Sequence, residues 1–151
     1  MTAHLEPTVV VDVANVMGAR ADGWWRDRPG AALRLYREIA DLAARGIPAG
    51  RLPARLPAAD GSAPCWVLVL EGRARDAAPR IGDDSPLVRV ISAPGSADDA
   101  IVAEVAAAPA AGSCLVVTAD RELRRRCEAA GAAVTGPRWL TDLLAESAHR
   151  A

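Results

Sequence analysis

The chain has 151 residues, 51% of them hydrophobic and 25% charged, and a formal net charge of -1. This length suits one domain, and the composition excludes a disordered chain, which would be poorer in apolar residues. The nearly balanced charge excludes a uniformly basic nucleic-acid binder, so any surface for a polyanion must be local.

Four short apolar runs, rich in β-branched residues, alternate with helical patterns. Because both faces of each run are apolar, the runs are predicted to be buried parallel strands over Thr8 to Val13, Cys65 to Leu70, Leu87 to Ile91 and Cys114 to Thr118. A shorter apolar run, Ala132 to Thr135, precedes the last helical pattern. The spacing of apolar residues predicts helices over Ala31 to Ala44, Ala97 to Ala107, Arg121 to Ala130 and Arg138 to Ser147. This alternation predicts an α/β fold with a mainly parallel central sheet and helices on both faces.

Two segments, residues 18–30 and 46–64, lack a clear period and are interpreted as irregular insertions. Neither is interpreted as a domain boundary, so we expect one domain over residues 1–151 with its core at about residues 8–146. The three cysteines lack zinc-like spacing, and Cys65 and Cys114 lie in apolar runs, where a thiol is usually buried. No apolar run is long enough to cross a bilayer and no secretory pattern opens the chain, so we expect a cytoplasmic protein without membrane contact.

Carboxylates follow three of the predicted strands. Asp12, Glu71 and Asp120 lie at or just after strand ends, and Asp98 and Asp99 begin a helix on the same side of such a sheet. Acids that converge there repel one another unless a cation intervenes, and Mg²⁺ or Mn²⁺ prefers such oxygen ligands. A hard divalent ion at this edge predicts phosphodiester hydrolysis. Each acid alone could instead cap a helix or a turn, but an unpartnered carboxylate at Asp12, inside an apolar stretch, would be costly.

Three segments of the sequence resemble the signature segments of NYN domains in the PIN-like nuclease superfamily, especially its YacP-like branch. The segments are Val9 to Val16 with its Asp-x-x-Asn pattern, Ala97 to Ile101 with Ala-Asp-Asp, and Val116 to Leu123 with Thr-x-Asp-Arg-Glu-Leu. The similarity spans about residues 8–144. It implies a three-layer α/β/α sandwich with a central parallel sheet, Mg²⁺ or Mn²⁺ in an acidic pocket, and endoribonuclease activity.

The same resemblance assigns roles to individual residues. Asp12 would be a primary metal ligand, and Asn15 would orient it or bind substrate. Asp98 would be the acid from the helix start, with Asp99 as its close competitor. The cluster would be completed by Asp120, with support from Thr118. Glu71 stands where relatives often have aspartate, and its longer side chain would reach the metal through water.

A Trp- and Arg-rich stretch follows the first signature segment. Tryptophan faces beside guanidinium groups can stack bases and bind phosphates, so Trp24, Trp25, Arg26 and Arg28 are candidate RNA-binding residues. The alternative is that one tryptophan packs under the loop while the arginines stay solvated or pair with Asp22 and Asp27. A second basic stretch begins at Arg121, which the helical spacing places nearest the acids for contact with phosphate.

These observations favour a metal-dependent endoribonuclease. Two alternatives stay open: a catalytically weak RNA- or ribosome-binding module, and a nucleotide phosphohydrolase that uses the same ions. RNA is the expected partner in the first two cases, and the sequence does not distinguish a monomer from a homodimer.

Overall fold

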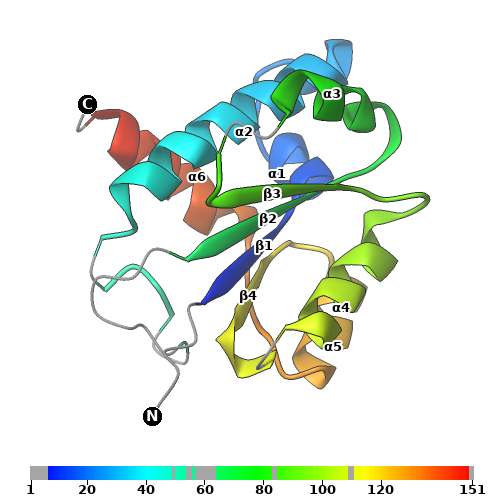
Figure 1. The fold of residues 1–151 in the computed structure, drawn as a ribbon, viewed down its shortest axis with the longest axis vertical. Coiled ribbons are helices and arrows are strands. Elements are labelled where there is room, and N and C mark those ends of the chain that lie inside the picture. The colour runs from blue at the N-terminus through cyan, green and yellow to red at the C-terminus, as the bar shows by residue number, and fades with distance from the viewer. Residues whose placement is uncertain are drawn as a thin grey trace.

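Five parallel strands form one sheet at the centre of the molecule (Figure 1). The protein is represented by a computed structural model that describes residues 7–48, 50–53, 56, 64–82, 85–108 and 111–149. The sheet order is β3-β2-β1-β4-β5, and all four pairings are parallel. The strands are β1 (Thr8–Asp12), β2 (Cys65–Leu70), β3 (Val88–Ser92), β4 (Cys114–Val117) and β5 (Ala133–Thr135).

Helices cover both faces of this sheet, which confirms the predicted three-layer α/β/α architecture. Figure 1 shows α4 and α5 on one face, and α1, α2, α3 and α6 on the other. The helices are α1 (Val13–Gly18), α2 (Arg28–Arg45), α3 (Ala78–Ile81), α4 (Ala97–Ala107), α5 (Arg121–Ala129) and α6 (Pro137–His149). Three short 3-10 helices accompany them: η1 (Trp24–Arg26), η2 (Gly72–Ala77) and η3 (Ala111–Ser113).

Two apolar clusters lie on opposite faces of the sheet. In β1, Val9 and Val11 belong to the cluster under α2 and α6, whereas Val10 belongs to the cluster under α4 and α5. Successive side chains of a strand point to opposite faces, so a strand covered on both sides must be apolar at every position. The continuous apolar runs of the sequence therefore have a direct structural cause.

The order in which strands are added to the sheet reverses between β1 and β4. From β1 it adds β2 and then β3 on one side, and it then crosses to place β4 and β5 on the other side of β1. In open parallel sheets, ligands bind outside the carboxyl ends of the strands where the strand order reverses. The end of β1 at Asp12 and the loop after β4 at residues 118–120 lie at this point.

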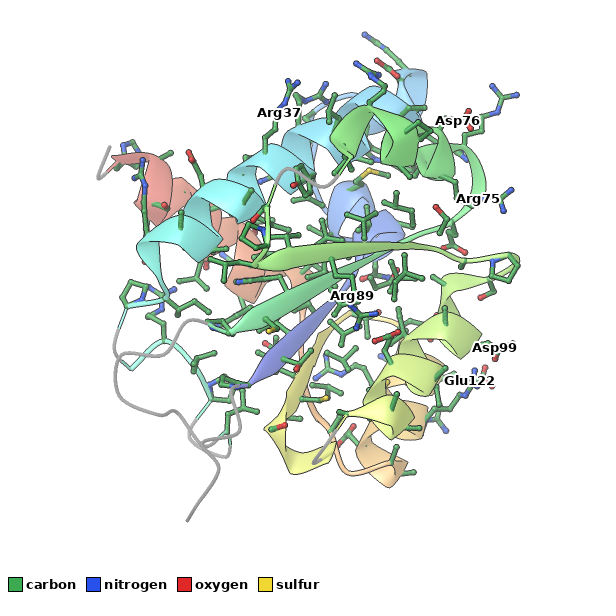
Figure 2. The ribbon with its side chains drawn as sticks, viewed as in Figure 1. Arg37, Arg75, Asp76, Arg89, Asp99 and Glu122 are labelled. Carbon is green, nitrogen blue, oxygen red and sulfur yellow. The ribbon has the colours of Figure 1, made fainter. Side chains whose placement is uncertain are left out.

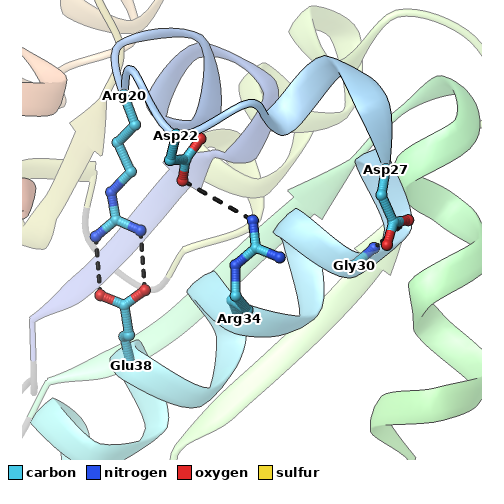
Figure 3. Close-up of polar contacts among 6 residues, drawn as sticks. All are labelled: Arg20, Asp22, Asp27, Gly30, Arg34 and Glu38. Atoms are coloured by element: carbon cyan, nitrogen blue, oxygen red, sulfur yellow. Dashed lines mark hydrogen bonds and ion pairs between the residues drawn. The ribbon is translucent and has the colours of Figure 1, made fainter.

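The structure corrects the segment between β1 and α2. Val13 begins α1 instead of ending β1, and α2 begins at Arg28 instead of Ala31, so residues 18–30 include the end of α1, all of η1 and the start of α2. The Asp27 side chain accepts a hydrogen bond from the Gly30 amide at 3.0 Å and caps α2, as Figure 3 shows. A side chain at Gly30 would collide with that carboxylate, so a substitution there would make the capping side chain of Asp27 move.

Further differences lie outside the core. η2 and α3 were not predicted, because each is too short to show a helical period. Cys65 was expected to be buried but is exposed, since it opens its strand. Of the predicted insertion at residues 46–64, the described part packs on the molecule: Leu56 is buried, and the Arg51 carbonyl accepts a hydrogen bond from the Trp139 indole. The other residues of that insertion lie outside the described residues. Within the described residues, no helix combines the length and apolar character that a membrane crossing requires.

Candidate active site

Three polar side chains continue the strand rows that face α4 and α5. Asp12 follows Val10 by two positions, Thr118 follows Val116 by two, and both valines belong to the α4 and α5 cluster. Glu71 follows Val69 in the same way, and Val69 pairs with Asp12 in the sheet register. The period of two therefore directs these three side chains to one face of the sheet at its carboxyl edge.

Asp12 is a buried carboxylate at this edge, only 5% exposed. Its Oδ2 accepts a hydrogen bond from the Thr118 hydroxyl at 2.9 Å. Burial raises the pKa of Asp12 to about 6, and the negative charges of Glu71 and Asp98 add to the rise. The Thr118 hydrogen bond and the backbone N–H of Asn15 act in the opposite direction, because they stabilise the charged form. The site thus holds one acid at a considerable electrostatic cost.

The raised pKa of Asp12 predicts a pH dependence of stability in the absence of divalent metal. Between the ordinary value of 3.8 and about 6, the native state binds more protons than the unfolded state. The free energy of unfolding should therefore fall as pH rises through this window, by roughly 2–3 kcal/mol from this group. Urea unfolding in EDTA at pH 4.5 to 7.5 measures the free energy of unfolding of wild type and of Asp12→Asn, and the difference between the two values isolates the contribution of Asp12. If this difference is the same at every pH, the predicted pH dependence is wrong.

The loop between β4 and α5 is tied to β1 and α1 by short hydrogen bonds. Thr118 Oγ1, which donates to Asp12, also accepts from the Asp120 amide at 3.1 Å. Asn15 Oδ1 accepts from the Ala119 amide at 2.8 Å. Asp120 Oδ1 in turn accepts from the Leu123 amide at 3.0 Å and caps α5. The first and third signature segments are therefore joined, with Thr118 and Asn15 as the joining side chains.

Thr118→Val tests this role of the hydroxyl, because valine keeps the buried shape and removes both hydrogen bonds. We expect the free energy of unfolding to drop by about 1–3 kcal/mol, and the pKa of Asp12 to rise further because its hydrogen-bond donor is lost. Urea unfolding measures the first effect and an NMR titration of the Asp12 carboxyl carbon the second. Thr118→Ser retains the hydroxyl and serves as the control. Equal Asp12 pKa values in the valine and serine variants would refute the assignment.

The start of α4 brings Asp98 toward the other acids and turns Asp99 away. Glu71 Oε2 accepts from the Ala97 amide at 3.0 Å and so fixes this helix end. Partial burial raises the pKa of Asp98, and the charges of Asp120 and Glu71 contribute. The Asp99 side chain is 85% exposed and pairs with Arg126 of α5 at 2.9 Å. Figure 2 shows Asp99 on the outer side of α4.

The chemistry of these donors fits a hard divalent cation. Asp12, Glu71, Asp98 and Asp120 offer carboxylate oxygens. Burial raises the pKa of Asp12 and of Asp98, and the charges of the neighbouring acids raise both values further. In the described part of the chain, no group of three or more His, Cys, Asp or Glu side chains is arranged so that it could hold a metal ion. Mg²⁺ commonly keeps several waters and takes only one or two protein carboxylates, so an ion at this edge would need fewer than three direct protein ligands.

A cavity of about 750 Å³ opens beside this edge, against Asn15 and Ala119. Its other wall includes Arg138, Thr141 and Asp142 of α6. Sequence reasoning missed these three residues, because α6 shows an ordinary apolar stripe and its polar face carries no motif. The volume lies within the usual range for small-molecule pockets.

The Trp- and Arg-rich stretch divides into a packed and an exposed part. Trp24 packs against the core cluster, whereas Trp25 is 57% exposed. The Arg26 guanidinium lies 5.7 Å from the centroid of the Trp25 ring, and that of Arg28 lies 5.5 Å from the Trp24 ring. The alternative pairing with Asp22 and Asp27 is not what the structure shows: Asp22 contacts Arg34 at 4.0 Å, beside the Arg20 and Glu38 pair, and Asp27 caps α2 (Figure 3).

The second predicted basic stretch lies on α5. Arg121 is exposed at the start of the helix, directly after Asp120, and Arg126 pairs with Asp99.

The sheet order, the two helical layers and the acidic carboxyl edge together define an α/β protein of PIN-like fold.

Comparison with known proteins supports this class. Among solved structures, a mutant of Rae1 (YacP) from Bacillus subtilis is similar, with a TM-score of 0.68 and 16% sequence identity over 95% of this chain and 78% of that chain. The chain therefore has a YacP-like fold, the branch that its sequence motifs resemble. No family model matches the sequence, and the comparison with curated proteins finds no match.

Proposed function

We propose that this protein is a metal-dependent endoribonuclease that hydrolyses RNA phosphodiester bonds at the carboxyl edge of its sheet. The observation that carries the proposal is Asp12, a buried carboxylate with a raised pKa at the reversal of strand order, whose pKa the charges of Glu71 and Asp98 raise further. Perturbed acids of this kind cluster at functional sites. The resemblance of the signature segments to NYN nucleases and the YacP-like fold support the reaction class.

We propose that Asp12, Asp98 and Asp120 hold Mg²⁺ or Mn²⁺, with one or two of these carboxylates in direct contact and the rest through the waters that such an ion keeps. When bound, such an ion supplies charge neutralisation at the scissile phosphodiester and lowers the pKa of water. Glu71 uses one oxygen to fix the start of α4 and thereby positions Asp98. Its other oxygen has no hydrogen bond among the described residues and could contact the ion through water.

The remaining residues orient the acids and the substrate. Thr118 fixes the rotamer of Asp12 by its 2.9 Å hydrogen bond, and Asn15 holds the Ala119 loop that carries Asp120. Arg121 is exposed and directly follows Asp120, and we propose that it binds a substrate phosphate. The cavity against Asn15 and Ala119, with Arg138 in its wall, offers space for a nucleotide at this edge of the sheet, although none of the four acids lines it.

The two adjacent acids of α4 provide a matched test of this assignment. We expect Asp98→Asn to lose most of the cleavage activity, on the order of 100-fold or more, because it faces Asp120 and Glu71. Asp99→Asn should retain activity within a few-fold, because Asp99 pairs with Arg126 at the surface. Initial rates on one RNA with Mn²⁺ compare the two variants. If Asp99→Asn lowers the cleavage rate more than Asp98→Asn does, Asp99 and not Asp98 is the metal ligand.

A second candidate is an RNA- or ribosome-binding module with little turnover. Two of the acids accept hydrogen bonds from backbone amides, Glu71 from Ala97 and Asp120 from Leu123. These hydrogen bonds stabilise helix starts, so the two carboxylates have a structural role even without a metal, which favours this candidate. Such a protein would bind RNA with no need for a divalent ion.

A substrate panel separates these functions. The purified chain is incubated with single-stranded RNA, structured RNA and nucleoside triphosphates, each with Mn²⁺, with Mg²⁺ and with EDTA. The nuclease predicts internal RNA cuts that need a divalent ion. Binding without cuts in every condition would favour the binding module, and release of phosphate from nucleotides alone would favour a phosphohydrolase. Either result would refute the proposed nuclease.

A further inference from the structure

A second pocket, of about 380 Å³, lies between the start of α2 and η2. One wall comes from Trp25, Arg26 and the first residues of α2, and the other from Arg73 and Asp76. These two walls are more than 40 residues apart in the sequence, so the pocket exists only because α2 packs against η2. None of the acids of the candidate active site lines it.

Trp25 is the feature of this pocket that most needs an explanation. Among the large hydrophobic side chains of the described residues, it alone is exposed. It is nevertheless supported: the Trp24 ring meets it edge-on at 6.1 Å and 89°, and Trp24 itself is anchored on the core. An exposed indole supported by a partly buried neighbour forms a platform on which an unpaired base can stack.

The charges around Trp25 favour a polyanion. Arg26, Arg28 and Arg73 line the pocket, and none of them takes part in an ion pair among the described residues. Of the two acids, Asp27 already caps α2, and Asp76 is exposed on η2, as Figure 2 shows. The Arg26 guanidinium lies over the Trp25 ring, and Arg28 and Arg73 line the same pocket. Guanidinium groups beside an aromatic ring match the phosphates that flank a stacked base, and a carboxylate such as Asp76 can accept a hydrogen bond from a ribose hydroxyl.

The pocket is close to the acidic edge along the chain. Arg73 follows Glu71 by two residues, and two residues span at most about 7 Å of backbone. Glu71 in turn accepts a hydrogen bond from the Ala97 amide at the start of α4, and Ala97 directly precedes Asp98. One single strand could therefore contact the pocket and the acidic edge together.

We propose that this pocket is a second RNA contact, in which Trp25 stacks one unpaired base and Arg26, Arg28 and Arg73 bind the neighbouring phosphates. The choice of RNA rests on the proposed function, but binding at this pocket needs neither the metal nor the acids. It would deliver single-stranded segments to the carboxyl edge of the sheet.

Fluorescence anisotropy with a labelled single-stranded RNA 12-mer in EDTA tests the proposal without cleavage. Trp25→Ala should weaken binding on the order of tenfold. Arg73→Ala should weaken it several-fold and reduce the salt dependence by about one phosphate contact. The matched control is Arg37→Ala, an exposed arginine of α2 that lines neither pocket and points to solvent in Figure 2, and it should bind as wild type does. Because Trp25 is exposed, its variant should melt as wild type does.

The outcomes separate this inference from the nuclease proposal. Wild-type affinity in Trp25→Ala, or equal affinity for a duplex of the same sequence, would overturn the second RNA contact whether or not the protein cleaves. If wild type cuts no RNA but its binding depends on Trp25 and Arg73, the nuclease proposal fails and the contact stands. An equal loss of binding in Arg37→Ala would show only general charge attraction and would also overturn it.

Discussion

Asp12→Asn is expected to abolish metal-dependent RNA cleavage and at the same time to stabilise the protein. Asparagine keeps the shape and an oxygen that can accept the Thr118 hydrogen bond, but it lacks the charge that a divalent cation needs. Loss of a primary ligand removes several kcal/mol of transition-state stabilisation, on the order of 1,000-fold in rate. The RNA cleavage rate with Mn²⁺ measures this loss.

The gain in stability has a separate cause. Burial and the charges of Glu71 and Asp98 hold the pKa of Asp12 at about 6, so the ionised form destabilises the folded state above that pH. Removing the charge at pH 8 should raise the free energy of unfolding by about 2 kcal/mol, and the Tm by roughly 4–8 °C. Asp41→Asn, at an exposed site on α2, is the control for both effects. An inactive Asp12→Asn with a lowered Tm would mean that the residue serves the fold, and would contradict the assignment.

Mn²⁺ is expected to raise the Tm of the wild-type protein at pH 7.5. A ligand that binds only the native state at 100 times its Kd adds about 2.7 kcal/mol, which corresponds to roughly 5–10 °C for a chain of this size. The rise should be smaller at pH 5, because Asp12, with a pKa of about 6, is then mostly protonated and a metal must displace that proton. Differential scanning fluorimetry with and without MnCl₂ measures both values.

The controls for this prediction distinguish a specific site from general screening. Asp12→Asn should lose the rise, whereas Asp99→Asn should keep it, since Asp99 is paired with Arg126 at the surface. NaCl at matched ionic strength should have little effect. The same rise in wild type and Asp12→Asn would mean that the ion binds elsewhere and would remove the main support for the nuclease.

The order of strands and helices could be read from the sequence because each carries its own local signal. Runs such as Val9 to Val11 are apolar at every position only when both faces are covered, and this pattern predicts a parallel sheet between helical layers. An aspartate at the end of such a run is conspicuous without any coordinates, since its burial needs a compensating partner. Asp12 and the edge on which it lies were accessible in this way, and the neighbour with a YacP-like fold agrees with the architecture.

Tertiary packing decided the rest, because side-chain direction and contacts between distant segments leave no local signal. Asp98 and Asp99 are adjacent in sequence but about 100° apart around a helix, and only the packing of α4 on α5 turns one to the acids and the other to Arg126. Glu71 looked like a ligand, yet the position of α4 gives it the Ala97 amide as a partner. Arg73 meets Trp25 only where η2 packs against α2. The sequence by itself determined which acids reach the carboxyl edge, and the fold determined which of them face one another there.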